Sequence, residues 1–306
     1  MKTSIIGAGN VGAQCAYRAA QKKLGEIVLV DIIEGVPRGK ALDMMQAGAV
    51  EGFQANILGT NNYKDTKGSD VVVITAGLAR KPGMSRDDLI IKNAEIMRSI
   101  VKPVVESSPN SILIIVTNPL DVMTYYAYRL SGFDSRRVMG MAPLLDSARM
   151  QYFISKSLNC PVEDVYAEVL GSHGDLMVPI PRLSTAKGKP ITELLTPEQV
   201  ENIIKKTKDG GAEIVALLKT GSAYYAPGSA AARMAESIMK DKKEVIGTCC
   251  YLKGQYGLED VYIGVPARLG RGGIEKIIEI ELMESEKIAL HAAAKSVKEL
   301  CEKLPL

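Results

Sequence analysis

The chain contains two histidines, and one of them lies in a setting that suits acid–base chemistry. His173 is flanked by glycines in GSHGD (171–175), directly after an apolar run, where a bend of the backbone would expose its ring. An imidazole can protonate a carbonyl oxygen near neutral pH because its pKa lies close to the working pH. His291 lies in an alanine-rich, charged segment, and we interpret it as a helix-surface or packing residue.

A histidine in this role needs a carboxylate that orients its ring, and Asp146 in LDSAR (145–149) is the candidate. Asp146 and Arg149 are three residues apart, so they share a face if a helix begins here. Asp146 would then also suit the N-cap of that helix, and capping alone is the alternative interpretation.

A glycine pattern near the start predicts a dinucleotide site. The pattern G-x-G-x-x-G is met, directly after an apolar run, by Gly7, Ala8, Gly9, Asn10, Val11 and Gly12. Gly7 would permit a tight turn, Gly9 would let the backbone approach a pyrophosphate, and Gly12 would let the helix pack closely on the strand. The N–H groups at the start of the helix would then hold the phosphate charge.

The choice of dinucleotide follows from Asp31, which ends the next apolar run. An acid about 20 residues beyond the glycines accepts hydrogen bonds from the adenine ribose, and its charge would repel a 2′-phosphate. Ile32 and Ile33 offer no arginine to receive that phosphate, so NAD is predicted rather than NADP. A plain glycine turn is the alternative, and a flavin or S-adenosylmethionine site could begin in the same way.

Two further segments carry polar groups at the carboxyl edge of the predicted sheet, where ligands bind. ARKPGMSRDDL (79–89) contains proline and glycine, as a moving loop does, and Arg80 and Arg86 could bind a dianionic substrate and exclude water on closure. A solvated basic loop is the alternative. Asn118 in VTNP (116–119) could donate to the substrate or the cofactor, or cap a helix that begins at Pro119.

The elements that must position these residues follow from hydrophobic periodicity. Apolar runs typical of strands buried on both faces cover residues 3–6, 27–31, 71–75, 112–116 and 138–141. Helical periodicity covers residues 11–22, 38–49, 87–107 and 119–130. Strands that alternate with helices imply right-handed βαβ crossovers, so the first half is predicted to be a Rossmann-type, doubly wound parallel sheet.

The second half lacks this alternation. A helix is predicted around 147–157, and strands without regular crossover helices are predicted at 165–170, 244–252, 261–269 and 276–282. Antiparallel pairing is therefore expected, with helices at 197–219 and 284–303 covering this second sheet. The predicted organisation of this α/β chain is an NAD-binding Rossmann domain at 1–145 and a catalytic α+β domain at 146–306, without a flexible hinge.

Composition excludes several other classes. The chain has 306 residues, of which 46% are hydrophobic and 24% charged, and its net charge of +3 is spread along the sequence, which argues against nucleic acid as a partner. No apolar run approaches the ~20 residues of a membrane span, and the start does not resemble a leader peptide, so we expect a cytoplasmic protein. The five cysteines (Cys15, Cys160, Cys249, Cys250 and Cys301) lack metal-site spacing, so no metal is expected.

Taken together, these segments resemble the lactate/malate dehydrogenase family, in order and through nearly the whole chain. Within the family the resemblance is greatest to the lactate-dehydrogenase-like malate dehydrogenases. GAGNVG is similar to the phosphate loop, ARKPGMSRDDL to the mobile substrate loop, VTNP to the nicotinamide-side turn, and LDSAR and GSHGD to the catalytic segments. The resemblance implies NAD contacts at residues 7–12, Asp31, Asn93, Val116, Thr117 and Asn118.

The resemblance also implies roles for individual residues. His173 would be the proton donor and acceptor, Asp146 its partner and Arg149 the clamp on the C1 carboxylate, and Arg86 would polarise the carbonyl. Arg80 is the discriminating position, because members that act on malate carry arginine there and those that act on lactate carry glutamine. Charge leads to the same conclusion, since a buried second carboxylate without a counter-ion would be very costly.

The implied activity is reversible oxidation of (S)-malate to oxaloacetate, as in the tricarboxylic acid cycle, by a homodimer or homotetramer. GSAYYAP (221–227) resembles the malate-type sequence, with Ala223 leaving room for the larger substrate. A dehydrogenase for lactate or another 2-hydroxy acid is one alternative, and a non-catalytic NAD-binding module is another. The chain departs from the family pattern in two places, at Pro143 and Leu144 before LDSAR and at Leu176 after GSHGD. Both places lie beside the predicted catalytic pair, so they bear on the reaction rate and on the fit of the substrate more than on the identity of the enzyme.

Overall fold

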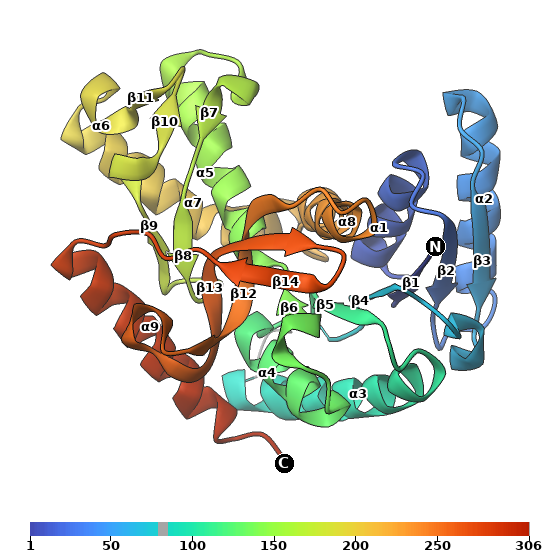
Figure 1. The fold of residues 1–306 in the computed structure, drawn as a ribbon. Coiled ribbons are helices and arrows are strands. Elements are labelled where there is room, and N and C mark those ends of the chain that lie inside the picture. Colours follow the sequence, from blue (N-terminus) through green and yellow to red (C-terminus); the bar gives the residue numbers. More distant parts are fainter. Residues whose placement is uncertain (79–84, 306) are drawn as a thin grey trace.

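The structure is a computed structural model that describes residues 1–78 and 85–305, apart from the side chain of Arg86. The described residues form a large twisted sheet with helices on both faces (Figure 1). Its parallel half has the strand order β3-β2-β1-β4-β5-β6, which confirms the predicted doubly wound arrangement. These strands are β1 (Lys2–Ile6), β2 (Glu26–Val30), β3 (Asn56–Thr60), β4 (Val71–Ile74), β5 (Ile112–Ile115) and β6 (Val138–Gly140).

Alternate residues of the parallel strands enter two separate hydrophobic cores, as a period of two requires. On β4, Val71 and Val73 belong to the core on one face, and Val72 and Ile74 to the core on the other. The connecting helices are α1 (Asn10–Gln21), α2 (Val36–Glu51), α3 (Arg86–Ser107) and α4 (Leu120–Ser131). Figure 1 shows α1 on one face of the sheet and α3 with α4 on the other.

The antiparallel strands extend the same sheet, which corrects the expectation of a separate second sheet. They are β8 (Val169–Gly171), β9 (Met177–Pro179), β12 (Glu244–Lys253), β13 (Glu259–Gly270) and β14 (Gly273–Ile277). β12 pairs with β6 at Cys249 and Gly140, and β13 pairs with β8 at Gly264 and Gly171. A Cβ at Gly140 would lie 2.9 Å from the Cβ of Cys249, so the missing side chain permits this junction.

The structure also corrects several predicted elements. The edge strand β3 and the helix α8 (Tyr225–Met239) were not predicted. The strand expected at 165–170 is divided into β7 (Val165–Tyr166) and β8, and the one expected at 276–282 is β14, which begins and ends earlier. The helix α7 (Pro197–Leu218), which was expected to cover the second sheet, packs on α5 (Ala142–Leu158). The helix α8 packs on α1 and the central sheet.

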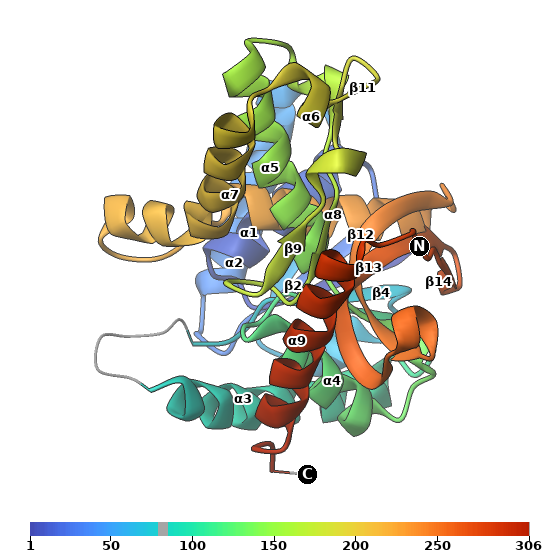
Figure 2. The ribbon, with the colours of Figure 1, turned by 90° about the vertical axis from the view of Figure 1, so that its left-hand side faces the viewer.

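The remaining elements complete the second half. A small sheet of β7, β10 (Thr185–Ala186) and β11 (Lys189–Pro190) packs with α5, α6 (Ile191–Leu194) and α7 around a third core. The helix α9 (Glu284–Cys301) crosses α4 and the antiparallel strands, as Figure 2 shows. Short 3-10 turns lie at Tyr63–Thr66, Ser135–Arg137, Val162–Asp164, Pro181–Leu183 and Gln255–Gly257.

The proposed division after residue 145 falls in the first turn of α5, and it stays a prediction. Within the described part of the chain, no helix has both the length and the apolar character needed to cross a membrane.

Candidate active site

The glycine loop after β1 has the shape that its sequence predicts. Gly7 has a φ of +104°, and a Cβ there would lie 2.8 Å from the backbone nitrogen of Ala76. A Cβ on Gly12 would lie 1.8 Å from the carbonyl oxygen of Gly7, so α1 can approach β1 only with glycine at this position. A Cβ on Gly9 would meet nothing within 4 Å, which leaves its backbone open to a ligand.

Asp31 and the glycine loop lie in contact. One carboxylate oxygen of Asp31 accepts a hydrogen bond from the backbone N–H of Ala8 at 2.6 Å, and the other accepts one from Ile33 at 3.0 Å. Lys40 of α2, which sequence reasoning missed, donates to the carbonyl oxygen of Ala8 at 2.6 Å. An acid at the end of β2 beside the first N–H groups of α1 suits a ribose next to a pyrophosphate, so these residues fit NAD.

A buried carboxylate orients the candidate acid–base histidine. The Nδ1 atom of His173 lies 2.9 Å from one oxygen of Asp146, and the guanidinium of Arg149 donates to the other oxygen at 3.1 Å. The side chain of Asp146 is 2% exposed and that of His173 18% exposed. Because Asp146 occupies Nδ1, the Nε2 atom of His173 is the one that can exchange a proton with a ligand.

The surroundings of His173 favour its protonated form. Burial alone would lower the pKa of its imidazole, but the charge and hydrogen bond of Asp146, with a smaller contribution from Asp121, more than offset this. Arg149 acts in the opposite direction. The net result is a raised pKa, which suits a group that must carry a proton to a substrate at neutral pH.

A cavity of about 310 Å³ brings together four residues singled out in the sequence. Its lining includes Asn118 after β5, Arg149 of α5, His173 between β8 and β9, and Ala223 before α8. Val11 of the glycine loop also lines it, so the substrate cavity opens beside the dinucleotide loop.

The helix α7 contributes residues to this cavity that sequence reasoning missed. Lys208, Gly211, Ala212 and Val215 line it, and their spacing of three and four residues places them on one face of the helix. A Cβ on Gly211 would lie 3.4 Å from the guanidinium of Arg149, so this glycine leaves room for the arginine. No local motif marks Lys208, because its place in the cavity depends on the packing of α7 against α5.

The two departures from the family pattern have clear positions. Pro143 is buried at the start of α5, in contact range of two glycines, since a Cβ on Gly264 or Gly247 would lie 2.3 or 2.9 Å from its ring. The two glycines therefore leave room for the ring of the proline. Leu176 is 40% exposed and is not part of the cavity lining.

Two residues expected to contact NAD also cross-link backbone segments in this structure. Asn93 is fully buried, and its amide group donates to the carbonyl oxygens of Asn118 at 2.6 Å and Leu78 at 3.1 Å. Thr117 donates to the carbonyl oxygen of Ala76 at 2.7 Å. Both hold the two turns at the carboxyl ends of β4 and β5 together, so they shape the predicted nicotinamide side of the site.

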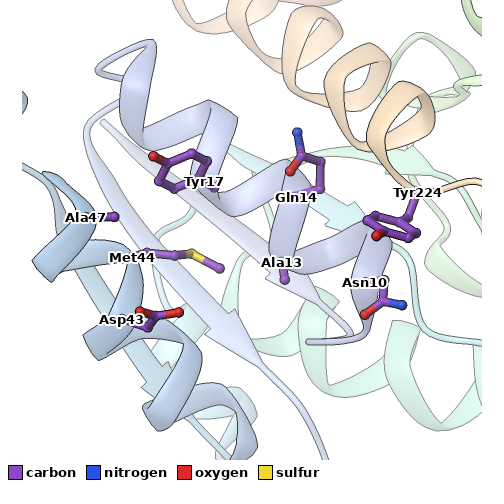
Figure 3. A pocket seen from close by; sticks show the side chains of 8 residues that line it. All are labelled: Asn10, Ala13, Gln14, Tyr17, Asp43, Met44, Ala47 and Tyr224. Atoms are coloured by element: carbon purple, nitrogen blue, oxygen red, sulfur yellow. The ribbon is translucent and has the colours of Figure 1, made fainter. Parts of the chain in front are cut away.

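The remaining predicted site residues are Asn10, Val116 and the two arginines of the predicted substrate loop. Asn10 lines a second cavity, between α1 and α2 (Figure 3). Val116 lines the substrate cavity. Arg80 lies outside the described residues, as does the side chain of Arg86, so their roles stay predictions. Among the residues that are described, no group of three or more histidine, cysteine or acidic side chains could hold a metal ion.

The fold and the site together define a class of protein. A doubly wound sheet with a dinucleotide loop opens beside a cavity that holds a carboxylate-paired histidine and an arginine. These are the parts of an NAD-dependent dehydrogenase that acts on a carboxylic acid.

Comparisons with known proteins identify the family. The family model described as lactate/malate dehydrogenase, NAD binding domain, matches residues 1–140, and the one described as lactate/malate dehydrogenase, alpha/beta C-terminal domain, matches residues 144–304. The chain belongs to the lactate/malate dehydrogenase family. It is 52% identical over 305 residues to the malate dehydrogenase of Chloroherpeton thalassium, covering 99% of this chain and 98% of that one.

Solved structures agree with this assignment. The malate dehydrogenase of Salinibacter ruber has 48% sequence identity and a TM-score of 0.96, with 99% of this chain and 97% of that chain covered. The lactate dehydrogenase of Cryptosporidium parvum, solved with lactic acid and NAD, has 38% identity and a TM-score of 0.95, with the same coverage of 99% and 97%.

Proposed function

We propose that the chain is an NAD-dependent malate dehydrogenase, which reversibly oxidises (S)-malate to oxaloacetate. The observation that carries this proposal is the pairing of His173 with Asp146 beside a cavity that Arg149 also lines. The relatives named malate dehydrogenase, which match nearly the full chain, support the choice of substrate. NAD, when bound, supplies the hydride acceptor for malate oxidation, and NADH supplies the hydride for the reverse reaction.

Arg149 binds and orients the substrate. Its guanidinium uses one N–H group on Asp146, and the remaining donors are available for the C1 carboxylate of the substrate. A planar guanidinium matches a carboxylate with two parallel hydrogen bonds, which fixes the direction of the C1–C2 bond.

His173 moves the proton. During oxidation its Nε2 atom takes the proton of the C2 hydroxyl group, and during reduction it returns that proton to the forming alkoxide. Asp146 holds the ring by Nδ1 and stabilises the imidazolium in the protonated state. The resemblance assigns polarisation of the carbonyl to Arg86 and neutralisation of the C4 carboxylate to Arg80.

The test compares substrates and then changes Arg80. Oxidation of NADH is followed at neutral pH with oxaloacetate or pyruvate, first in the parent chain and then in Arg80→Gln. A strong preference for oxaloacetate that Arg80→Gln reduces is the expected result. Arg136→Gln is the matched control, because the side chain of Arg136 is 69% exposed and does not line the cavity.

Other outcomes identify the alternatives. If pyruvate is preferred, the chain is a lactate-type dehydrogenase and the assignment of Arg80 is wrong. If NADH binds but neither acid is reduced, the chain is a binding module without turnover. The retained contacts among His173, Asp146 and Arg149 weigh against that last reading.

We also propose that the chain assembles with copies of itself through α2 and the start of α8. Leu42 and Met45 of α2 are 54% and 37% exposed, and Tyr225 at the start of α8 is 65% exposed. The second cavity, of about 310 Å³, lies beside them, and Figure 3 shows the side chain of Met44 extending from α2 towards α1, with Tyr224 at the far end. Apolar side chains gathered around a hollow are typical of a surface that another chain covers.

Sedimentation velocity tests this assembly. The parent chain is expected to sediment as a dimer or tetramer, and Met45→Glu is expected to shift it towards the monomer, because a buried unpaired carboxylate is costly. A parent chain that is monomeric at micromolar concentration would exclude the proposal. Location in the cytoplasm and a place in the tricarboxylic acid cycle stay predictions.

A further inference from the structure

We propose that Asp121 is a positioning residue, which fixes the loop of His173 against α4 and stabilises the protonated imidazole. This inference rests on the proposed dehydrogenase activity, in which His173 carries the proton. Asp121 lies in the first turn of α4, three residues after Asn118, and it belongs to none of the motifs singled out in the sequence.

Three donors from two distant segments converge on the Asp121 carboxylate, which is 3% exposed. The hydroxyl of Ser172 donates to one oxygen at 2.9 Å, and the backbone N–H of His173 donates to the same oxygen at 3.0 Å. The thiol of Cys249 in β12 donates to the other oxygen at 3.2 Å. The carboxylate therefore bonds to the backbone of the catalytic histidine itself and not only to a neighbour.

Asp121 also connects the two sides of the cavity. Its helix begins directly after the turn that carries Asn118, which lines the predicted nicotinamide side. The hydrogen bonds of Asp121 hold the opposite side, where His173 lies. A change in this carboxylate would thus alter the distance between the proton-transfer group and the cofactor side, on which the alignment of the reacting atoms depends.

The charges around His173 come from three helices and from its own loop. Asp146 and Arg149 belong to α5, and Asp121 belongs to α4, while Asp175 and Lys208 line the same cavity. The two carboxylates raise the pKa of His173 and Arg149 lowers it. Asp121 thus acts on His173 through charge as well as through position.

The ionisation of Asp121 is a balance of opposing effects. Burial raises the pKa of its carboxyl group above its usual value, although the hydrogen bonds from Ser172, Cys249 and the backbone of His173 act in the opposite direction and favour the anion. Burial raises the pKa of the Cys301 thiol in α9, and the charge of Asp121 adds to this effect. Because each donor stabilises the anion, removal of one donor is expected to reduce the charge that His173 feels.

The experiment measures the titration of His173 directly. The chain has two histidines, so a protein labelled with ¹³C at histidine Cε1 gives two signals per chain, and His291→Gln assigns them. In Asp121→Asn the signal of His173 is expected to titrate at lower pH than in the parent chain. The kcat for oxaloacetate is expected to fall about tenfold, the size of a lost charge-assisted hydrogen bond, with a smaller change in KM because Arg149 is untouched.

Two further variants make the result decisive. Asp164→Asn is the matched control, because it removes one carboxylate from an exposed turn and should leave both the His173 titration and the kcat unchanged. Cys249→Ala removes one donor and keeps the carboxylate, so it should move the His173 titration in the same direction by less. If Asp121→Asn does not fold, the shift in Cys249→Ala carries the test.

The outcomes separate this inference from the proposed function. A folded Asp121→Asn protein with an unchanged His173 titration would overturn the inference, even if turnover falls, because the carboxylate would then act only on stability. An unchanged titration in Cys249→Ala would overturn it where Asp121→Asn does not fold. Failure of the parent chain to reduce oxaloacetate would refute the proposed function, whereas the titrations would still measure the charge effect.

Discussion

Glu168 offers a test of how the strand that leads to the catalytic loop responds to pH. Glu168 directly precedes β8, is 5% exposed, and accepts a hydrogen bond from the hydroxyl of Tyr166. Burial raises the pKa of its carboxyl group from 4.5 to about 7, although the hydrogen bonds from Tyr166 and the backbone of Val169 act in the opposite direction. The folded chain therefore keeps this group protonated at a pH where the unfolded chain ionises it.

The sign of the effect on stability follows from this difference. A carboxyl group with a higher pKa in the folded chain adds stability that is complete below the unfolded value of 4.5 and is lost as the pH rises through the folded value of about 7. A rise of about 2.5 in pKa corresponds to about 3 kcal/mol. Glu168→Gln has a neutral side chain at every pH, so the variant should lose none of this stability between pH 4.5 and 8.

The assay is urea unfolding at pH 5, 6, 7 and 8, at one fixed protein concentration because assembly stabilises the folded chain. The unfolding free energy of Glu168→Gln minus that of the parent chain is expected to rise by about 2.5 kcal/mol across this range, because the loss has already begun at pH 5. The subtraction removes the contribution of other groups, such as His173, that titrate in both proteins. Glu163→Gln is the control, because Glu163 is exposed on the same segment and should give a flat difference.

A flat difference in Glu168→Gln as well would refute the reasoning. It would mean that Glu168 is ionised in the folded chain at pH 5, with water or a cation meeting the charge. A difference that falls with pH would mean that the hydrogen bond from Tyr166 outweighs burial.

Three other substitutions test the site. Asp146→Asn is expected to reduce kcat about a hundredfold and to move the pH profile of kcat to lower pH, because the charge that raises the pKa of His173 is lost. Steady-state kinetics measures this profile, and an unshifted profile would contradict the expectation. Gly12→Ala is expected to lower both the unfolding free energy, by about 2 kcal/mol, and the NADH affinity, because the new Cβ would lie 1.8 Å from the carbonyl oxygen of Gly7. Gly9→Ala, whose new Cβ would meet nothing within 4 Å, should keep its stability and lose NADH affinity in a fluorescence titration. An unchanged affinity in this variant would show that the loop does not approach the ligand.

The parallel strands could be predicted from the sequence because both of their faces are buried, which leaves a continuous apolar run. The edge strand β3 is the exception. Its residues alternate between exposed and buried, Leu58 is 43% exposed, and Gly59 interrupts the run. An edge strand has one neighbour and one open side, so its sequence is not constrained to be apolar throughout.

The helix α8 could not be predicted for the opposite reason. Nearly all residues from Pro227 to Met239 are buried, including Glu236, so no polar face marks a period of 3.6. The proline and glycine near its start also suggest a turn. The helix forms because it packs between α1 and the central sheet, which is information that no local window contains.

The residues of the site also differ in whether the local sequence could predict them. His173 and Asp146 could be predicted because each lies in a short segment with distinctive chemistry, and the structure places them 2.9 Å apart. Asp121 and Lys208 could not, since an acid in the first turn of a helix and a lysine on an amphipathic helix have ordinary local explanations. Their positions in the site depend on contacts between segments that lie far apart in the sequence. Asp121, for example, forms hydrogen bonds to residues 172, 173 and 249, which are more than 50 residues away.

The continuity of the sheet explains how these distant residues keep their distances. Asn118 and Asp121 follow β5 in the parallel half, whereas His173 follows β8, which the sheet of the described residues connects to the parallel half through β13 and β12. β12 and β13 pair along most of their length, whereas the junctions at the two ends of this route, β12 with β6 and β13 with β8, are single pairs of residues that include Gly140 and Gly264. A Cβ at Gly264 would lie 2.3 Å from Pro143 and 2.6 Å from the carbonyl oxygen of Gly171, so the spacing at β8 is set by backbone contact and not by a flexible side chain. The hydrogen bonds of Asp121 then join β8 directly to α4 and close a loop of rigid contacts around the cavity, which is why a carboxylate outside the catalytic motifs can govern the position of His173.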